Sequence, residues 1–160
     1  KTNLILFTKP IKKWDIIFAK FLASLTIGKI CLIPTLIFVY SIYNISDPIG
    51  NIDVGELIGS YLGIMMLISL YSSIGLFCSS ISNNNMIAYI LTIIIILLLY
   101  MGVNILGTAY NLYIFEFLSI QSHYESISRG VIDSRDIIYF SSIIFLFLYF
   151  SSVLIEQKNI

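Results

Sequence analysis

Charged residues are scarce in this sequence. Asp, Glu, Lys and Arg together make up 11% of the 160 residues, whereas hydrophobic residues make up 58%, and the mean hydropathy is +0.95. Soluble domains carry roughly 25% charged residues, so this composition excludes a soluble globular domain. The nine basic and nine acidic residues balance and give no indication of nucleic-acid binding. The sequence therefore predicts an all-α, polytopic bundle of membrane-spanning helices that forms a single domain over residues 1–160.

Residue patterns that enzymes need are also missing. No Gly-rich phosphate loop occurs, so the chain cannot hydrolyse ATP by that route. His123 is the only histidine, which excludes a zinc-protease helix, and no Gly-x-Ser-x-Gly segment or pair of intramembrane aspartates is present. Cys31 and Cys78 both lie inside apolar stretches, so we expect packing thiols rather than a disulfide. We expect no catalytic residue and no metal site in this chain.

Four apolar stretches are long enough to cross a bilayer, which takes about 20 helical residues. Turn-forming residues end the first stretch, and a short polar hinge with good capping residues separates the second from the third. Residues 107–136 mix aromatic and polar side chains, which indicates an interfacial or re-entrant segment. The expected spans are residues 16–42, 57–81, 86–106 and 137–155.

Basic residues gather at the start of the chain. Five lysines against Asp15 within the first 20 residues predict a cytoplasmic N-terminal segment, since short cytoplasmic loops carry the excess of Lys and Arg. Four spans then return the C-terminus to the cytoplasm, and the acidic loop at 47–56 lies outside. The chain starts at Lys1 rather than methionine, so we expect earlier membrane helices to precede it.

The segment at 1–15 combines a short apolar stretch, a proline and a basic stretch with one tryptophan. By general physics it is a helix on the lipid surface or, alternatively, an element that docks to a protein. Its sequence, with Ile17, Lys20 and Phe21 after it, resembles the cytoplasmic coupling segment of ABC-2 type transporter permeases. An acidic residue expected a few positions before the leucines is either replaced here by Asn3 or lies in sequence that precedes Lys1. The resemblance implies that the ATPase-coupling residues are Leu6, Thr8, Lys9, Pro10, Lys12, Lys13 and Trp14.

A second match covers residues 123–140, which resemble the segment before the last helix of these permeases, particularly of gliding-motility-associated subunits. Residues 47–53 and 59–61 also resemble those subunits. By general physics, Gly130 ends the preceding helix and Asp133 caps the last span. Asp136 lies three residues after Asp133, which is the spacing of a capping box. Arg129 is placed to pair with Glu125. The segment is either a plain surface corner or an outer gate at the exit, whose residues would be His123, Glu125, Ser128, Arg129, Gly130, Asp133 and Asp136.

Two further features lie inside the spans. Gly55, Gly59 and Gly63 repeat every four residues, which allows close helix packing, either within the chain or between two chains. Lys29 is a charge within the first span and is either a snorkelling lysine or a residue that faces a polar cavity.

The resemblance implies that these are the last four spans of a six-helix ABC-2 permease in the bacterial inner membrane. The chain would be the permease subunit of an exporter in a gliding-motility-associated system. Its partners would be an ABC ATPase subunit, which binds ATP and Mg²⁺, a second permease chain, and further gliding-motility envelope proteins. The alternative is a structural membrane subunit that anchors or scaffolds an envelope complex without transporting anything.

Overall fold

The computed structural model describes residues 13–110 and 118–157 of the chain. Every regular element in those residues is a helix, and none is a strand, which confirms the all-α fold class. Four helical stretches are long and apolar enough to cross a membrane. Each contains one of the four stretches expected from the sequence and extends it by a few residues. These stretches are Trp14–Ile45, Val54–Ile81, Asn85–Gly107 and Ser134–Gln157.

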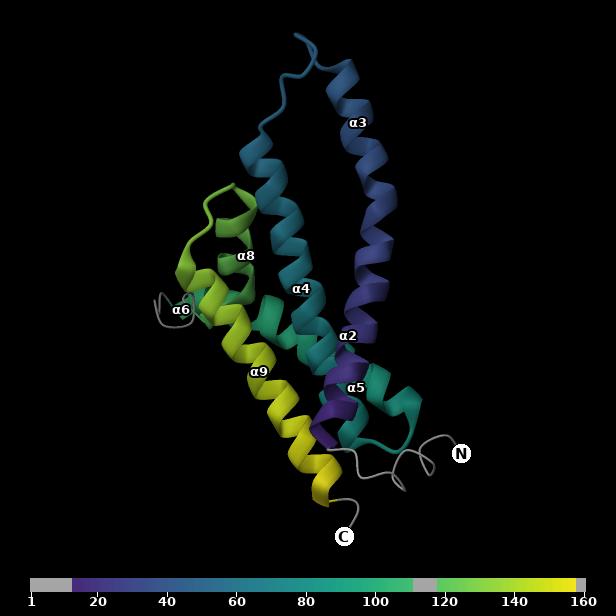
Figure 1. Cartoon of the computed structure of the whole chain (residues 1–160). Coiled ribbons are helices and arrows are strands. Elements are labelled where there is room, and N and C mark those ends of the chain that lie inside the picture. Colours follow the sequence, from purple (N-terminus) through teal and green to yellow (C-terminus); the bar gives the residue numbers. More distant parts are fainter. Residues whose placement is uncertain (1–12, 111–117, 158–160) are drawn as a thin grey trace.

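The first span consists of three elements: α2 (Lys13–Leu32), the 3₁₀ turn η1 (Ile33–Thr35) and α3 (Leu36–Ile45). Pro34 lies inside the 3₁₀ turn and explains it, because proline has no N–H to continue the α-helical hydrogen bonds. Figure 1 shows α3 leaning away from α4, and α3 has no buried residue. The first span therefore packs against other helices at its start and is exposed at its end.

The central helix is α4 (Val54–Ile81), which contacts α2, α5, α8 and α9. It begins at Asp53, whose Oδ1 accepts hydrogen bonds from the backbone N–H groups of Gly55 (2.9 Å) and Glu56 (3.1 Å). Cys78 belongs to the buried core. Cys31 is exposed, so the expectation that both cysteines pack is wrong for Cys31. Its neighbours in α2 are mostly apolar, so the sequence does not show which of them face the other helices.

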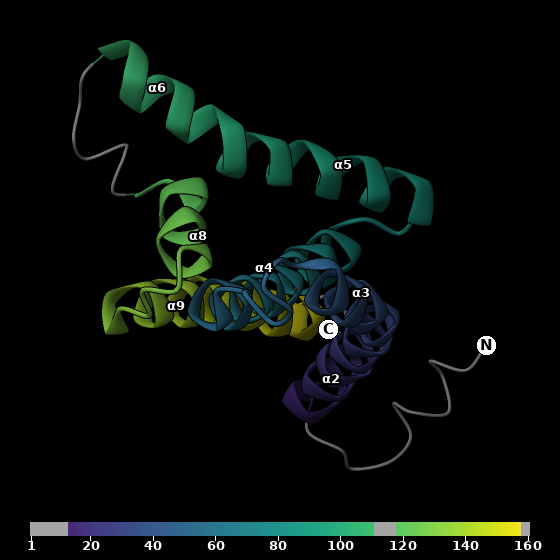
Figure 2. The ribbon, with the colours of Figure 1, turned by 90° about the horizontal axis from the view of Figure 1, so that it is seen from above.

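The third span runs through α5 (Asn85–Leu97), the π-helical turn η2 (Leu98–Gly102) and α6 (Val103–Tyr110). Asn84 caps it, because its Oδ1 accepts from the backbone N–H of Met86 at 2.9 Å. Figure 2 shows α5 and α6 to one side of α4 and α9, with α8 (Ile120–Ser128) between α6 and that pair.

The last helix, α9 (Ser134–Gln157), packs along α4. Leu70 and Ile74 of α4 share a core with Phe140 of α9, and Ser80 and Ser151 share a hydrogen bond of 2.6 Å. The start of α2, the α4–α5 hinge and the end of α9 lie toward one end of the molecule, while loop 46–53 and the α8–α9 turn lie toward the other (Figure 1).

Candidate functional site at the α8–α9 corner

Helix α8 is short and amphipathic. Its buried residues Ile120, His123 and Ile127 lie at helical spacing and so share one face. Ile120 and Ile127 join the core formed by α4 and α9. His123 therefore places an imidazole ring on the side of α8 that faces the core, where a polar group needs a partner.

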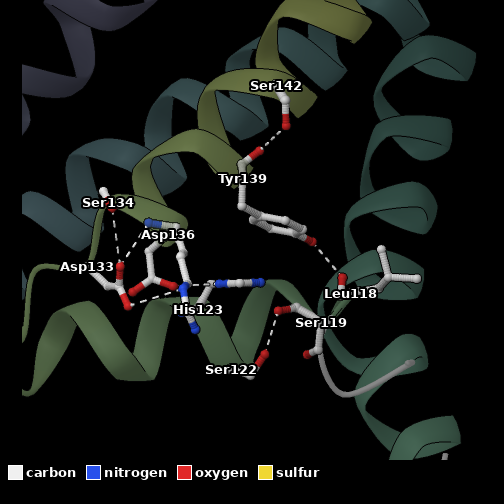
Figure 3. A network of polar contacts seen from close by, with 10 residues as sticks. Leu118, Ser119, Ser122, His123, Asp133, Ser134, Asp136, Tyr139 and Ser142 are labelled. Atoms are coloured by element: carbon white, nitrogen blue, oxygen red, sulfur yellow. Dashed lines mark hydrogen bonds and ion pairs between the residues drawn. The ribbon is translucent and has the colours of Figure 1, made fainter. Parts of the chain in front are cut away.

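The partner of His123 is Asp136, in the first turn of α9. His123 Nδ1 and Asp136 Oδ1 lie 2.6 Å apart (Figure 3), and the two residues are only 7% and 5% exposed. A separation this short requires a hydrogen between the two atoms, and burial strengthens the interaction because water does not compete. The pair joins α8 to α9 across the turn between them.

Two polar atoms beside this pair are buried without a hydrogen-bond partner in the part of the chain that the structure describes. They are Oδ2 of Asp136 and Oγ of Ser119. An unsatisfied buried polar atom costs roughly 1–3 kcal/mol. The site therefore holds α8 and α9 together while leaving half of the Asp136 carboxylate unpaired.

Tyr139 completes the contact between α8 and α9. Its ring stacks on His123 with centroids 4.0 Å apart and planes 21° apart, and its hydroxyl donates to the backbone oxygen of Leu118 at 2.5 Å (Figure 3). Asp136 and Tyr139 are three residues apart on α9 and so lie on one face. One helical turn of α9 thus contacts both His123 and the chain just before α8.

The turn between α8 and α9 depends on local backbone chemistry. Gly130 has a φ of +82°, a region that favours glycine. Asp133 caps α9, because its Oδ1 accepts from the backbone N–H of Arg135 at 3.0 Å. The capping-box role expected for Asp136 is wrong, because its Oδ1 contacts His123 and its Oδ2 has no partner.

Glycines of α4 form the seat on which α8 lies. A Cβ on Gly59 would meet the backbone oxygen of Ile127 at 2.2 Å, and one on Gly63 would meet the Tyr124 ring at 3.0 Å. A Cβ on Gly130 would meet the backbone carbon of Gly55 at 2.8 Å, whereas one on Gly55 itself would meet only Asp53 Oδ1 at 3.2 Å. Gly59 and Gly63 therefore serve close packing inside this chain, the first of the two alternatives left open by the spacing of the glycines.

Hydrogen bonds on the opposite edge of α8 reach α6. Glu125 accepts from Gln121 Nε2 at 2.8 Å, and Gln121 Oε1 accepts from Asn104 Nδ2 at 2.7 Å. Arg129 donates from Nε to the backbone oxygen of Glu125 at 3.1 Å rather than to its carboxylate, which corrects the expected side-chain pairing. Ser128 accepts at its backbone oxygen from Ser60 Oγ of α4 at 3.3 Å.

Of the expected coupling residues, only Lys13 and Trp14 belong to the described part of the chain. Leu6, Thr8, Lys9, Pro10 and Lys12 fall outside the described residues, and Lys13 is the first residue of α2. The ring of Trp14 packs against Phe145 of α9 with centroids 6.1 Å apart. The structure therefore brings together the residues expected at the corner and separates them from the start of α2.

The sequence does not indicate the contacts that Tyr139 makes with His123 and Leu118. Tyr139 is one of 11 tyrosines, and only its spacing of three from Asp136 could have indicated a shared site. In the described ranges, 13–110 and 118–157, no group of three or more His, Cys, Asp or Glu residues comes together that could hold a metal ion. The arrangement suits the positioning of α8 rather than catalysis, since it pairs its polar groups across a helix contact.

Comparison with protein families gives one match, to the family described as ABC-2 family transporter protein, over residues 1–155. No curated protein and no solved structure matches the chain.

Proposed function

The chain belongs to the ABC-2 family of transporter proteins, and we propose that it is the permease subunit through which a separate ATPase drives export across the bacterial inner membrane. The observation that carries this proposal is the family match over 155 residues together with four helices suited to span a membrane. The sequence has no phosphate loop of the Walker type, so ATP and Mg²⁺ would bind to the partner ATPase.

The start of α2 supports a coupling role for residues 6–14. The predicted coupling segment continues directly into α2, where Ile17 and Phe21 form a buried cluster with Leu148 of α9. Because Trp14 also packs on α9, a push on the segment would act on two membrane helices at once. The N-terminal segment and the C-terminus would face the cytoplasm, where the ATPase lies.

Purification in mild detergent with mass spectrometry of co-eluting chains tests the ATPase coupling. We expect a nucleotide-binding ATPase to co-elute with the native chain and to be lost or uncoupled when Pro10, Lys12 and Lys13 are all changed to Ala. Arg135→Ala is the control, because it removes an exposed cation, with a side chain 80% exposed, toward the other end of the molecule. Recovery of structural envelope proteins alone, unchanged by the substitutions, would favour a scaffold over a transporter.

The physiological setting is a finer part of the proposal. The sequence resemblances at residues 123–140, 47–53 and 59–61 support a gliding-motility-associated permease of the GldF type, paired with a second permease chain and with further envelope proteins of that system. Deletion of the gene should abolish gliding, and the wild-type gene should restore it while the triple alanine variant should not. Normal gliding after deletion would contradict this setting and leave the ATPase pairing standing.

A further inference from the structure

Lys29 of α2 lies at the middle of the membrane-spanning part of the molecule. It is halfway along the 32-residue helical stretch Trp14–Ile45. Its neighbour Gly28 provides a second measure of depth, because a Cβ there would meet Ile68 Cγ2 at 2.6 Å, and Ile68 is at the middle of the 28-residue helix α4. Both measures place Lys29 midway between the two ends of the spans.

The side chain of Lys29 points away from the rest of the chain. It is exposed, and α2 lies at an edge of the bundle, on the side of α4 away from α5 and α6 (Figure 2). Among the described residues no hydrogen bond or ion pair involves its ammonium group. The chain thus presents a cation at mid-depth on an outer face.

Snorkelling cannot bring this ammonium to the membrane surface. The hydrocarbon core is about 30 Å thick, so its middle lies about 15 Å from either surface. An extended lysine reaches only about 6 Å from its helix. A charge held in hydrocarbon at this depth is costly and calls for a partner or an aqueous path.

Among the residues that the structure describes, no anion lies at the depth of Lys29. Asp15, Glu56, Asp136 and Glu156 lie in the first or last turns of their spans, and the other acidic residues lie in the segments between spans. A second copy of this chain has the same distribution and would bring a second Lys29 instead of a counter-charge. The complementary anion must therefore come from outside these residues.

We propose that the Lys29 face of α2 lines an aqueous translocation path and that Lys29 binds an acidic group of the transported molecule, a phosphate or a carboxylate. The inference rests on the proposed export function and names the class of substrate. Thr26 is exposed one turn before Lys29 on the same face and would lie in the same path.

Cysteine labelling in intact membranes tests this path without knowledge of the substrate. In a background with Cys31→Ser and Cys78→Ala, Thr26→Cys is exposed to two water-soluble methanethiosulfonates, one carrying a sulfonate and one a trimethylammonium group. We expect both to react and the sulfonate reagent to be favoured, because a unit charge about 6 Å away changes the ratio of the two rates about tenfold even in water. Lys29→Gln should abolish the preference, and Lys29→Arg should retain it.

The control is Ile94→Cys in the same background, a residue 51% exposed on the apolar surface of α5, which should react with neither reagent. Absence of reaction at position 26 would overturn the proposal, since lipid or a partner helix then covers the face. A reaction whose charge preference survives Lys29→Gln would overturn it as well. Labelling does not depend on ATP, so the two proposals can fail separately. If position 26 shows the charge preference but the chain binds no ATPase, the proposed export function is wrong and the proposed aqueous path at Lys29 stands.

Discussion

The four spans are all apolar, yet they pack very differently. Helices α4 and α9 bury residues along much of their length, whereas α3 buries none and α5 buries only Ala88. The third span, which contains α5, is nevertheless the most apolar of the four. Hydropathy therefore does not decide which helices pack together in this molecule.

What distinguishes α4 and α9 from α3 and α5 is the presence of small and polar residues at their helix contacts. Gly59 and Gly63 of α4 admit α8, and Ser80 meets Ser151 of α9. Lipid tails are as apolar as leucine, so close backbone approach and hydrogen bonds have to hold membrane helices together. In the described part of the chain, α3 and α5 have no close glycine approach or serine pair of this kind, so their apolar faces are left to lipid or to other helices.

The largest effect should come from matched truncations in the two groups. Leu70 of α4 is fully buried and Ile94 of α5 is 51% exposed. We expect Leu70→Ala to lower the free energy of unfolding by about 2–5 kcal/mol because it leaves a cavity, and Ile94→Ala to change it by less than about 0.5 kcal/mol. Unfolding of the isolated chain in mixed detergent micelles measures both. Equal losses would break the comparison, because Ile94 would then contribute as much as Leu70 to the stability of the isolated chain.

The glycine seat should give the next largest effect. Gly59→Ala puts a methyl group against the backbone of Ile127 and Gly130, which cannot rotate away, so we expect a loss of about 1–3 kcal/mol and faster hydrogen exchange in α8. Gly75 is the matched control, because a Cβ there meets only Thr92 Cγ2 at an ordinary 3.9 Å. A Gly59→Ala chain as stable as Gly75→Ala would refute the seat.

Features that depend on a few neighbouring residues could be predicted from the sequence. The four spans follow from length and composition, and the turn at Gly130 and the cap at Asp133 follow from the chemistry of single residues. The hinge cap at Asn84 is of the same kind. Such signals lie within one or two turns of the chain, so no knowledge of the tertiary packing is needed to interpret them.

Features that depend on how helices face one another could not be predicted. Asp136 has the spacing of a capping box, but the register of α8 against α9 turns it to His123, 13 residues away. The exposure of Cys31 and the burial of Cys78 have the same origin, since helices that are mostly apolar do not indicate which face packs. For the same reason, the spacing of Gly59 could not show whether this residue packs within the chain or against a second chain.

Substitution in the His123–Asp136 pair tests whether the α8–α9 corner is packed as tightly as α4 and α9. Asp136→Ala removes the buried partner of His123, so we expect a loss of about 1–3 kcal/mol in the same unfolding measurement. Asp133→Ala removes only an exposed cap of α9 and should cost about 1 kcal/mol. If Asp136→Ala proved neutral, the unpaired Oδ2 would offset the bond to His123, and the pair would contribute no net stability.

The smallest effect should come from Tyr139→Phe, which keeps the ring on His123 and removes only the hydroxyl that donates to Leu118. One neutral hydrogen bond contributes about 1 kcal/mol at most sites, so the unfolding free energy should fall by that amount or less at this exposed contact. Hydrogen exchange should quicken at the start of α8, beside Leu118, and stay unchanged at its end, where the glycine seat holds it. Uniformly faster exchange along α8 would mean that the hydroxyl, rather than the glycines of α4, keeps α8 with the packed helices.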